Sequence, residues 1–365
     1  MSHSRGGHPA LRRPARIRVG VLFGGRSGEH EVSVRSAASV VQAIDKSKYQ
    51  AVPIGITKAG RWLSSSQSVK LLPGAEGLGG TDQNRSLMIR PAPGSVEAVD
   101  VVFPVLHGTF GEDGTVQGLL ELAGVPYVGA GVLGSAASMD KDVMKRLFRE
   151  RGLPTPGHAA VLRSQIGDRR LRARLARRFG FPLFVKPANL GSSVGITKVH
   201  AGPELGPALE LAAGFDRKIL VEEAIDGREI ECSVLGNDRP EASVPGEIIP
   251  CREFYDYEAK YIDDRSELII PARLTRAQTR RVQRLAVEAF LACECCGMAR
   301  VDFFLERGSG RLLLNEINTI PGFTSISMYP KLWEASGVGY AELIDRLIQL
   351  ALERHVERTQ TRYSI

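Results

Sequence analysis

The strongest constraint on the fold comes from two strand-like runs, residues 300–305 and 312–318, which a short turn separates. Both runs are rich in Val, Leu, Ile and Phe, whereas the segment between them contains two glycines and a serine. Apolar runs separated by a glycine-containing turn predict an antiparallel β-hairpin. The C-terminal third of the chain is therefore expected to contain an antiparallel sheet.

The polar residues of this hairpin are expected to gather on one face. Pairing the strands about Ser309 places Asp302 opposite Glu316 and Arg300 opposite Asn318. Side chains alternate along a strand, so these four share a face. Two carboxylates and an amide oxygen are the hard donors that suit Mg²⁺. The alternatives are a surface hairpin with a cross-strand ion pair, or a register slip that would scatter the set.

A second element suited to phosphate follows the strand that ends at Lys186. The loop 189–195 reads Asn-Leu-Gly-Ser-Ser-Val-Gly. Its small residues allow backbone N–H groups to approach phosphate oxygens, and Ser192 and Ser193 add hydroxyl donors. Lys186 would supply a point charge. This is not a P-loop, because no Gly-Lys-Ser/Thr opens a helix here, and the alternative is an ordinary turn.

The length of 365 residues favours two or three domains. Apolar strand patterns alternate with helical patterns in the first part of the chain, which predicts a parallel α/β sheet. The expected strands lie at 18–23, 51–56, 99–106, 125–128, 181–187 and 218–223. The expected helices lie at 32–44, 139–151, 171–179, 275–296 and 340–358. Of two polar segments, 64–93 is predicted to be a surface excursion and 253–264 a loop.

Composition excludes several classes of protein. The hydrophobic content of 43% and charged content of 24% are ordinary for a globular protein, and no apolar run reaches the roughly 20 residues of a membrane span. The first 18 residues carry five arginines and no acid, which accounts for +5 of the formal +7. We therefore predict a disordered basic tail at 1–16 and a nearly neutral body, which argues against a nucleic-acid partner.

Cysteine usage points to the compartment. The chain has five cysteines, and three of them, Cys293, Cys295 and Cys296, cluster in a spacing that fits no common zinc site. The cluster lies in a helical pattern, so reduced and partly buried thiols are expected. We therefore predict a cytoplasmic location.

The segment 129–134, Gly-Ala-Gly-Val-Leu-Gly, matches the dinucleotide-binding fingerprint G-x-G-x-x-G. The acidic residue expected about 20 positions later at a strand end is missing, because Glu150 lies inside an expected helix. We interpret the segment as a tight strand-to-helix turn. A dinucleotide-binding oxidoreductase remains the alternative from a different functional class.

Several motifs occur together in one order. The Lys186 loop, the pair Glu222-Glu223 at a strand end and the 300–318 hairpin resemble the ATP-grasp superfamily. Three further segments are similar to the D-alanine–D-alanine ligase family: His-Gly-Thr-Phe-Gly-Glu-Asp-Gly at 107–114, Phe-Tyr-Asp-Tyr-Glu-Ala-Lys-Tyr at 254–261, and Asn-Thr-Ile-Pro-Gly-Phe-Thr at 318–324. The resemblance covers roughly residues 17–353.

The resemblance implies a three-domain ATP-grasp architecture of the α/β class. An N-terminal parallel α/β domain would span 17–137, a central domain 138–223 and a C-terminal domain 224–365. ATP would be held between the central and C-terminal α+β domains. The family resemblance also suggests a homodimer.

The implied reaction has two steps. One D-alanine carboxylate takes the γ-phosphoryl group of ATP and becomes a D-alanyl phosphate, and the amine of a second D-alanine then displaces phosphate. The product would serve peptidoglycan precursor synthesis. The reaction would use two Mg²⁺ ions, or Mn²⁺ in their place. The alternatives are another ATP-grasp carboxylate–amine ligase and a nucleotide-binding regulatory protein without turnover.

The resemblance also implies the residues of the site. Those implied in catalysis are Glu29, Ser192, Tyr261, Arg300 and Ser327. Those implied to bind the D-alanines are Glu29, His107, Arg300, Gly322, Ser327 and Met328. Those implied to bind ATP are Lys141, Lys186, Ser192, Ser193, Glu222, Glu223, Ala224, Ile225, Glu229 and Lys260. Those implied to hold metal are Asp302, Glu316 and Asn318.

The implied roles follow the charges of the reacting groups. Glu29 would pair with the ammonium of the first D-alanine, and Ser192 and Tyr261 would link to it and close a lid that favours an amine nucleophile. Arg300 would stabilise the tetrahedral oxyanion. Taken alone, Glu29 is equally an acid at a helix start.

The interpretation of two further positions stays open. His107, taken alone, is more often a structural histidine. The pair Glu223-Ala224 stands where the family often has lysine followed by an aromatic residue.

Overall fold

The computed structural model describes residues 16–73, 99–191, 193–249 and 267–362 of the chain. Nearly all of the expected basic tail, most of the segment 64–93 and all of the segment 253–264 lie outside these residues. Ser192, Lys260 and Tyr261 also lie outside them, so the expected lid contacts stay predictions.

The N-terminal sheet is parallel, as the sequence predicts. Its strand order is β2-β1-β3, and each of the three strands carries buried apolar residues. The strands are β1 (Ile17–Gly24), β2 (Tyr49–Ile56) and β3 (Val101–Pro104). The helices of this part are α1 (His30–Ala43), α2 (Ser65–Leu71) and α3 (Thr115–Ala123).

The segment 64–93, expected to be a surface excursion, begins with a helix, because a capping box between Ser64 and Gln67 starts α2 there. One local expectation in this part was wrong. The strand expected at 125–128 forms only a single bridge, between Tyr127 and Val102.

Two helices replace the single helix expected at 139–151. They are α4 (Val132–Met139) and α5 (Lys141–Glu150), and Asp140 separates them. The Asp140 carboxylate accepts the N–H groups of Asp142 and Val143, which caps α5 at its start. The sequence pattern therefore gave α5 correctly within two residues and missed α4.

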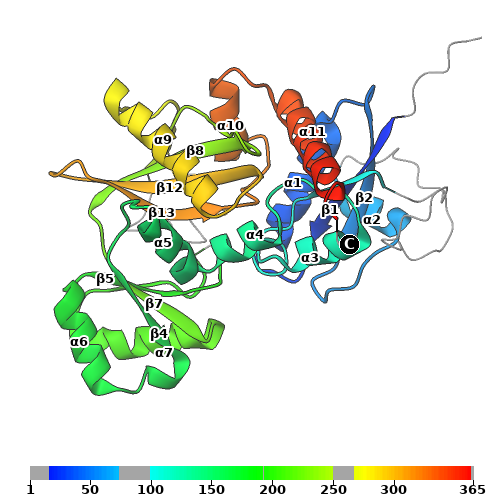
Figure 1. Ribbon diagram of the computed structural model, residues 1–365. Coiled ribbons are helices and arrows are strands. Elements are labelled where there is room, and N and C mark those ends of the chain that lie inside the picture. Colours follow the sequence, from blue (N-terminus) through cyan, green and yellow to red (C-terminus); the bar gives the residue numbers. More distant parts are fainter. Residues whose placement is uncertain (1–15, 74–98, 192, 250–266, 363–365) are drawn as a thin grey trace, which may run out of the picture.

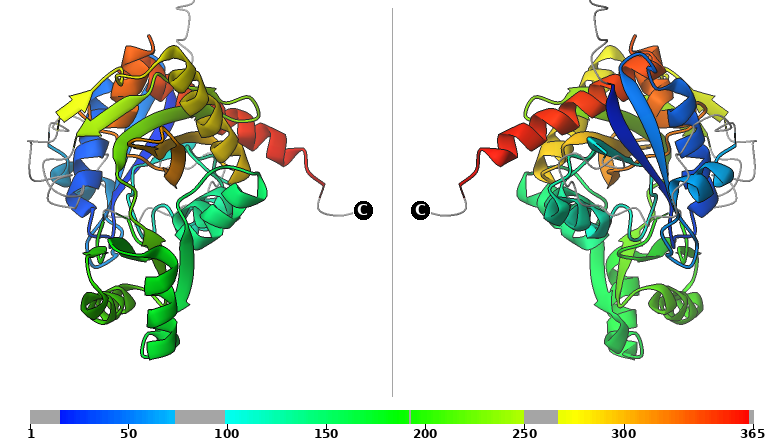
Figure 2. Two further views of the ribbon diagram at one scale, coloured as in Figure 1. Left: turned by 90° about the vertical axis from the view of Figure 1, so that its left-hand side faces the viewer. Right: turned by 90° about the vertical axis from the view of Figure 1, so that its right-hand side faces the viewer.

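A middle lobe consists of a four-stranded antiparallel sheet in the order β4-β7-β5-β6, with two helices packed on it. Figure 1 shows this lobe in green, and both views of Figure 2 show it projecting away from the rest of the molecule. The strands are β4 (His158–Leu162), β5 (Leu183–Pro187), β6 (Thr197–Val199) and β7 (Lys218–Glu223). The α-helices are α6 (Arg169–Phe179) and α7 (Leu205–Phe215), and short 3₁₀ helices lie at Arg163–Gln165 and Gly202–Glu204.

The C-terminal sheet is six-stranded and antiparallel, with the order β11-β10-β8-β12-β13 and β9 on β8. Its strands are β8 (Gly227–Gly236), β9 (Glu241–Ala242), β10 (Gly246–Ile249), β11 (Glu267–Ile269), β12 (Gly297–Glu306) and β13 (Leu312–Asn318). The helices of this part are α9 (Arg276–Ala292), α10 (Met328–Ala335) and α11 (Tyr340–Thr359). The helix expected at 275–296 ends four residues earlier, at Ala292.

The last helix returns to the start of the chain. Leu343, Ile344 and Leu347 of α11 are fully buried in the same core as residues of β1, β3 and α1. The Tyr49 hydroxyl at the start of β2 donates to Asp345, 2.6 Å away. Figure 1 shows α11 beside α1 and β1. The C-terminal helix therefore completes the N-terminal core. No helix in the described part of the chain has the length and apolarity needed to cross a membrane.

We predict that Phe290→Ala lowers the free energy of unfolding by about 3–5 kcal/mol. Phe290 of α9 has no exposed surface and lies in the core beneath the C-terminal sheet, so its removal leaves a cavity. Urea denaturation measures the change. The control Leu122→Ala, at a side chain that is 92% exposed, should change it by no more than about 0.5 kcal/mol. Equal effects of the two substitutions would contradict the prediction.

Candidate active site

A cleft of about 590 Å³ lies between the middle lobe and the C-terminal sheet. Its volume is typical of a small-molecule site. Of the residues expected to bind ATP or metal, those that line it are Lys141, Lys186, Ser193, Ala224, Ile225, Glu229, Asp302 and Glu316. Residues more than 170 positions apart in the sequence therefore meet at one cleft.

The 300–318 hairpin has the predicted register. Asp302 faces Glu316, and Arg300 faces Asn318. The pairing then shifts, because Phe303 faces Leu314 and Asn315 becomes an extra residue in β13. Through this bulge, Asn315 and Glu316 both reach the cleft, although neighbours in a regular strand point to opposite faces.

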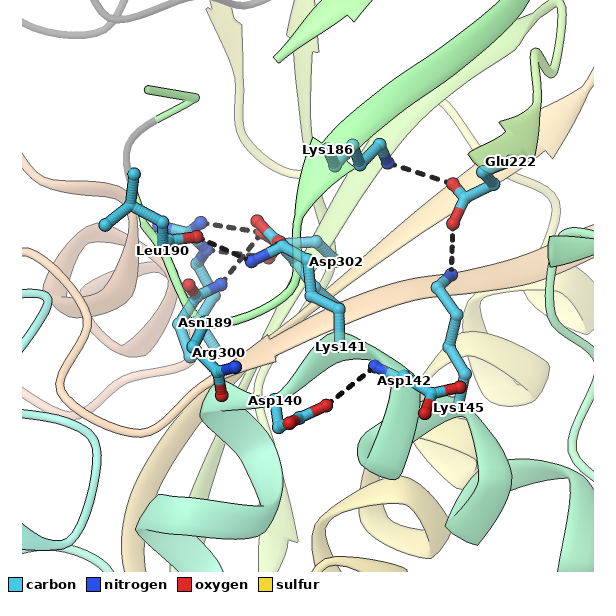
Figure 3. Close-up of polar contacts among 12 residues, drawn as sticks. Asp140, Lys141, Asp142, Lys145, Lys186, Asn189, Leu190, Glu222, Arg300 and Asp302 are labelled. Atoms are coloured by element: carbon cyan, nitrogen blue, oxygen red, sulfur yellow. Dashed lines mark hydrogen bonds and ion pairs between the residues drawn. The ribbon is translucent and has the colours of Figure 1, made fainter. Parts of the chain in front are cut away.

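Arg300 lies at the centre of the polar face (Figure 3). Its Nε and Nη2 atoms donate to the two oxygens of Asp302, each at 2.7 Å, and Nε lies 3.0 Å from Glu231 Oε2. Burial opposes the charge of Arg300, but Asp302, Glu231 and Glu316 outweigh it and raise the pKa of the guanidinium well above its usual range. The guanidinium is therefore permanently charged.

Glu231 belongs to the same acidic face but was not expected there from the sequence. This residue lies on β8, directly opposite Asp302 on β12, and it lines the cleft. The signal was present, because Glu229 and Glu231 are two residues apart in one strand and must share a face. Glu229 was expected at the site, and the same alternation places Glu231 there too.

The three expected metal ligands have a donor set that fits Mg²⁺. Asn318 Nδ2 donates to Asp302 at 3.0 Å, which leaves the amide oxygen as the atom able to bind a cation. Glu316 lines both the cleft and a small adjoining pocket of about 40 Å³, and Asn318 lines that pocket. Among the described residues, no group of three or more His, Cys, Asp and Glu side chains is arranged to hold a metal. Two carboxylates and one amide are nevertheless a suitable partial shell for Mg²⁺, which keeps several waters.

Lysines lie on the other side of the cleft (Figure 3). Lys186 Nζ is 2.9 Å from one oxygen of Glu222, and Lys145 Nζ is 3.0 Å from the other. Lys141 Nζ donates to the Leu190 carbonyl at 2.8 Å and lies 3.5 Å from Glu316. Lys145 was not expected at the site from the sequence, although it lies one helical turn after Lys141 on α5.

Glu222 is a buried carboxylate stabilised by cations. Burial raises its pKa, but Lys145 and Lys186 outweigh burial and lower the pKa to about 2. Burial lowers the pKa of Lys145, and Glu222 opposes that effect. These groups therefore form one coupled unit that reaches from the buried interior to the cleft, which Lys186 lines.

At the end of the cleft expected to hold adenine, the neighbouring residues Glu222 and Glu223 point their side chains in different directions. Glu223 turns out of the cleft: its carboxylate accepts the Gly157 N–H at 2.7 Å, and its own N–H donates to the Gly157 carbonyl. Glu222 points to the lysines instead. The chain therefore presents Ala224 and Ile225 to the cleft at this point.

His107 is fully engaged by protein groups. Its Nδ1 lies 2.9 Å from the Ile320 carbonyl, which can only accept, so Nδ1 carries the hydrogen. Nε2 then accepts the Ser36 hydroxyl at 3.1 Å, and Ser36 Oγ accepts the Phe323 N–H. Burial lowers the pKa of His107 and outweighs the charge of Glu29. His107 is therefore a neutral group that holds the 320–323 turn.

Glu112, for which the sequence predicts no role, holds the same turn from another side. Its two oxygens accept the N–H groups of Gly108 at 2.7 Å and Ile320 at 3.0 Å. Burial and the charge of Glu29 raise the pKa of Glu112 above its usual range, against these two donors. The backbone of Ile320 is thus held at both its N–H and its carbonyl by one loop of the N-terminal domain.

Glu29 lies in a pocket closed by two glycines. It is 8% exposed. A Cβ atom at Gly108 would lie 2.6 Å from Glu29 Oε2, and one at Gly191 would lie 3.2 Å from the same atom. Gly108 also has φ +75°, which favours glycine. The loop after β3 therefore needs glycine at 108, and the loop after β5 approaches the same carboxylate closely at Gly191.

The expected site for a second carboxylate is the start of α10. Ser327 is the N-cap residue, but its hydroxyl bonds to Thr324 rather than to the helix. Gly322 lies beside it, since a Cβ atom there would be 3.1 Å from Ser327 Oγ. The Met328 side chain packs with Ile248 and Leu332, so any contact from Met328 to an anion would come from its backbone N–H.

The glycines at 129–134 serve close packing between parts of the chain. A Cβ atom at Gly134 would lie 2.5 Å from the Glu294 carbonyl, and one at Gly297 would lie 3.0 Å from the Gly129 nitrogen. The C-terminal part of the chain therefore covers this segment, where a dinucleotide would need access to the backbone. This packing favours the turn interpretation.

Two antiparallel sheets that enclose a cleft, with acids on one side and lysines on the other, define an ATP-grasp protein. The family described as "D-ala D-ala ligase N-terminus" matches residues 18–130, and "D-ala D-ala ligase C-terminus" matches residues 147–349. The chain belongs to the D-alanine–D-alanine ligase family. Members of this family are ATP-dependent ligases that use a divalent metal.

Individual relatives agree with this. The chain is 55% identical to the D-alanine–D-alanine ligase of Solibacter usitatus, over 96% of this chain and 99% of that one. The solved D-alanine-D-alanine ligase from Coxiella burnetii has a TM-score of 0.81 at 39% identity, covering 94% of this chain and 96% of that one. VanG D-Ala:D-Ser ligase from Enterococcus faecalis has a TM-score of 0.78 at 37% identity, covering 92% of this chain and all 100% of that one.

We predict that Glu222→Gln flattens the acid side of the stability profile. The pKa of Glu222 falls from the usual 4.5 to about 2 in the folded protein, so the unfolded state binds its proton first as the pH drops. The stabilisation from this carboxylate is therefore complete above about pH 4.5 and is lost toward pH 2. Urea midpoints across this window should fall less steeply in the variant than in the wild type.

The control for this prediction is Glu150→Gln, because the Glu150 side chain is 76% exposed. Its profile should follow the wild type. Parallel profiles for Glu222→Gln and the wild type would contradict the prediction.

Proposed function

We propose that this chain is an ATP-dependent D-alanine–D-alanine ligase that joins two D-alanine molecules through a D-alanyl phosphate. The observation that carries the proposal is the cleft in which Asp302 and Glu316 face Lys141 and Lys186. Full-length similarity to ligases of this name supports the substrate. The product would serve peptidoglycan precursor synthesis.

The first step needs a cationic cleft. A carboxylate is a poor electrophile because its leaving group would be oxide, and phosphorylation supplies a better one. Lys141 and Lys186 would bind ATP phosphates, and Asp302, Glu316 and Asn318 would hold the metal. Bound Mg²⁺, for which we propose two ions with Mn²⁺ able to substitute, would neutralise the phosphate charge.

ATP would also contact the remaining expected residues. Ser192, Ser193 and Lys260 would bind its phosphates, and Glu229 its ribose. Glu223, Ala224 and Ile225 would read adenine through the backbone, because the Glu223 side chain is bound to Gly157. Glu222 would act through Lys186.

The second step needs a donor where negative charge develops. Attack by the amine turns the acyl carbon tetrahedral and places charge on its oxygen. Arg300 uses Nε and Nη2 for Asp302 and Glu231, so Nη1 is the donor that a substrate would use. The two carboxylates fix the guanidinium before the substrate arrives, so little reorganisation is needed during the step.

The substrates would be oriented from opposite ends. Glu29 would bind the ammonium group of the first D-alanine, with Ser192 and Tyr261 closing the lid over it. Gly322, Ser327 and the Met328 N–H would bind the carboxylate of the second. His107 and Glu112 would act indirectly, because they hold the Ile320 peptide that precedes this turn.

The family resemblance further suggests a homodimer. A cytoplasmic location agrees with the four described cysteines, which are all free thiols. Both statements are part of the proposal, and neither is needed for the chemistry.

One assay separates the proposed function from its alternatives. The protein is incubated with ATP, Mg²⁺ and D-alanine, and phosphate and D-alanyl-D-alanine are quantified. Parallel reactions replace D-alanine with D-serine or L-alanine, or supply NADH in place of ATP. D-alanine-dependent release of both products supports the proposal. ATP binding without turnover, a preference for another amino acid, or NADH oxidation would each overturn it.

We predict that Arg300→Lys lowers kcat by about 100-fold or more, the cost of removing a preplaced oxyanion donor. Lysine keeps one charge between Asp302 and Glu231 but loses the bidentate geometry and Nη1. The affinity for ATP should change by no more than a few-fold. Arg300→Ala is less informative, because it leaves two buried carboxylates without their cation.

Steady-state kinetics and calorimetric titration with Mg-ATP measure the two effects of this substitution. The control is Arg311→Lys on the same hairpin, where the arginine pairs with Glu306 and is largely exposed. A normal kcat for Arg300→Lys would show that the role of Arg300 is wrong.

A further inference from the structure

One buried cation near the cleft has no role in the reaction proposed above. Lys145 of α5 is 1% exposed, and its Nζ lies 3.0 Å from Glu222 Oε2. Lys186 lies 2.9 Å from the other Glu222 oxygen. Lys186 lines the cleft, whereas Lys145 does not. One carboxylate is therefore shared by a cation inside the protein and a cation at the cleft (Figure 3).

The two lysines come from different parts of the fold. Met144 and Phe148, which flank Lys145 on α5, are fully buried in the core beneath the C-terminal sheet. α5 also packs on α9 and β13. Glu222 and Lys186 lie on neighbouring strands of the middle lobe, where Glu222 faces Phe184 and Lys186 faces Leu220, so the two are diagonal neighbours on one face of the sheet. The Lys145–Glu222 pair therefore joins the two lobes that enclose the cleft.

The charge count shows what Lys145 contributes. Lys186 and Glu222 alone would form a neutral pair, in which the carboxylate competes with phosphate for the ammonium. With Lys145 on the second oxygen, the three groups carry a net charge of +1. Glu222 then competes less with phosphate for Lys186, because Lys145 already neutralises the charge of Glu222.

We propose that Lys145 is a positioning residue for ATP, which neutralises Glu222 from the opposite lobe so that Lys186 stays available to a phosphate group. The inference rests on the proposed use of ATP, and it adds a residue that does not touch the nucleotide. Lys145 acts through Glu222 and Lys186, so its loss should weaken ATP binding selectively.

A purely structural link between the lobes is the competing explanation, and the chain offers a matched control. Lys218 of β7 lies 2.6 Å from Asp140 at the start of α5. This pair also joins the middle lobe to α5, but it does not include Glu222. Lys218→Met therefore removes an interlobe ion pair without changing the charge around Lys186.

The first experiment compares Lys145→Met with Lys218→Met. Methionine keeps most of the side-chain volume and removes the charge. For Lys145→Met we expect the Kd of Mg-ATP by calorimetry and the KM for ATP to rise about tenfold, with the KM for D-alanine changing less than twofold. Lys218→Met should change the ATP constants less than twofold. Equal effects of the two substitutions, or a parallel rise in both KM values, would overturn the proposal.

A double substitution tests the route through Glu222. In Lys145→Met, the remaining charge of Glu222 draws Lys186 away from phosphate, and Glu222→Gln removes that charge. The double variant should therefore bind ATP at least threefold more tightly than Lys145→Met alone. Additive losses in the double variant would show that Lys145 does not act through Glu222.

Two further measures keep the outcomes distinct. If Lys145→Met does not fold, as judged by circular dichroism, Lys145→Gln replaces it with the same expectation, because it also lacks the charge but can donate a hydrogen bond to Glu222. The ATP affinity is measured without D-alanine. A wild type that binds ATP but forms no dipeptide would refute the ligase function while the Kd comparison still decides the role of Lys145.

Discussion

The bidentate pair between Arg300 and Asp302 is the interaction on which the site depends. Asp302, Glu231 and Glu316 come from three adjacent strands and lie on one face of the C-terminal sheet. Like charges placed that closely repel one another, and burial strengthens the repulsion. Arg300 makes the cluster stable, because its guanidinium binds two of the acids directly. The same contacts hold the guanidinium in place, so the structural and proposed catalytic roles of Arg300 cannot be separated by deleting it.

The 320–323 turn, which is proposed to adjoin the second substrate, depends on a link between distant parts of the chain. Ile320 donates its backbone N–H to Glu112 and its carbonyl accepts from His107, so a loop of the N-terminal domain fixes a turn of the C-terminal part. α11 ties the same two parts together through the apolar core. A turn fixed at both ends loses little entropy when it binds a small substrate. Under the proposed function, changes at His107 would therefore act on the second substrate as much as on the first.

The sequence predicted most of what depends on local periodicity. The alternation in β12 and β13, with a turn centred on Ser309, was sufficient for the register of Asp302 and Glu316, which the structure confirms. It could not show the bulge at Asn315, which depends on pairing between strands. Lys145 was missed for a similar reason, since nothing local distinguishes a buried lysine on an amphipathic helix from an exposed one. Its burial is a consequence of Glu222, 77 positions away, and only the tertiary fold shows that contact.

The pair formed by Lys141 and Glu316 shows how the two sides of the cleft act together. Their charged atoms are 3.5 Å apart, across the boundary between the lysine side and the acid side. In the proposed reaction, a phosphate group would compete with Glu316 for Lys141, and a metal ion would compete with Lys141 for Glu316. Either ligand alone would leave one partner of the pair with an uncompensated charge, which is costly at low exposure. A metal–phosphate unit compensates both at once, so the geometry favours ATP that binds together with its metal over either ligand on its own.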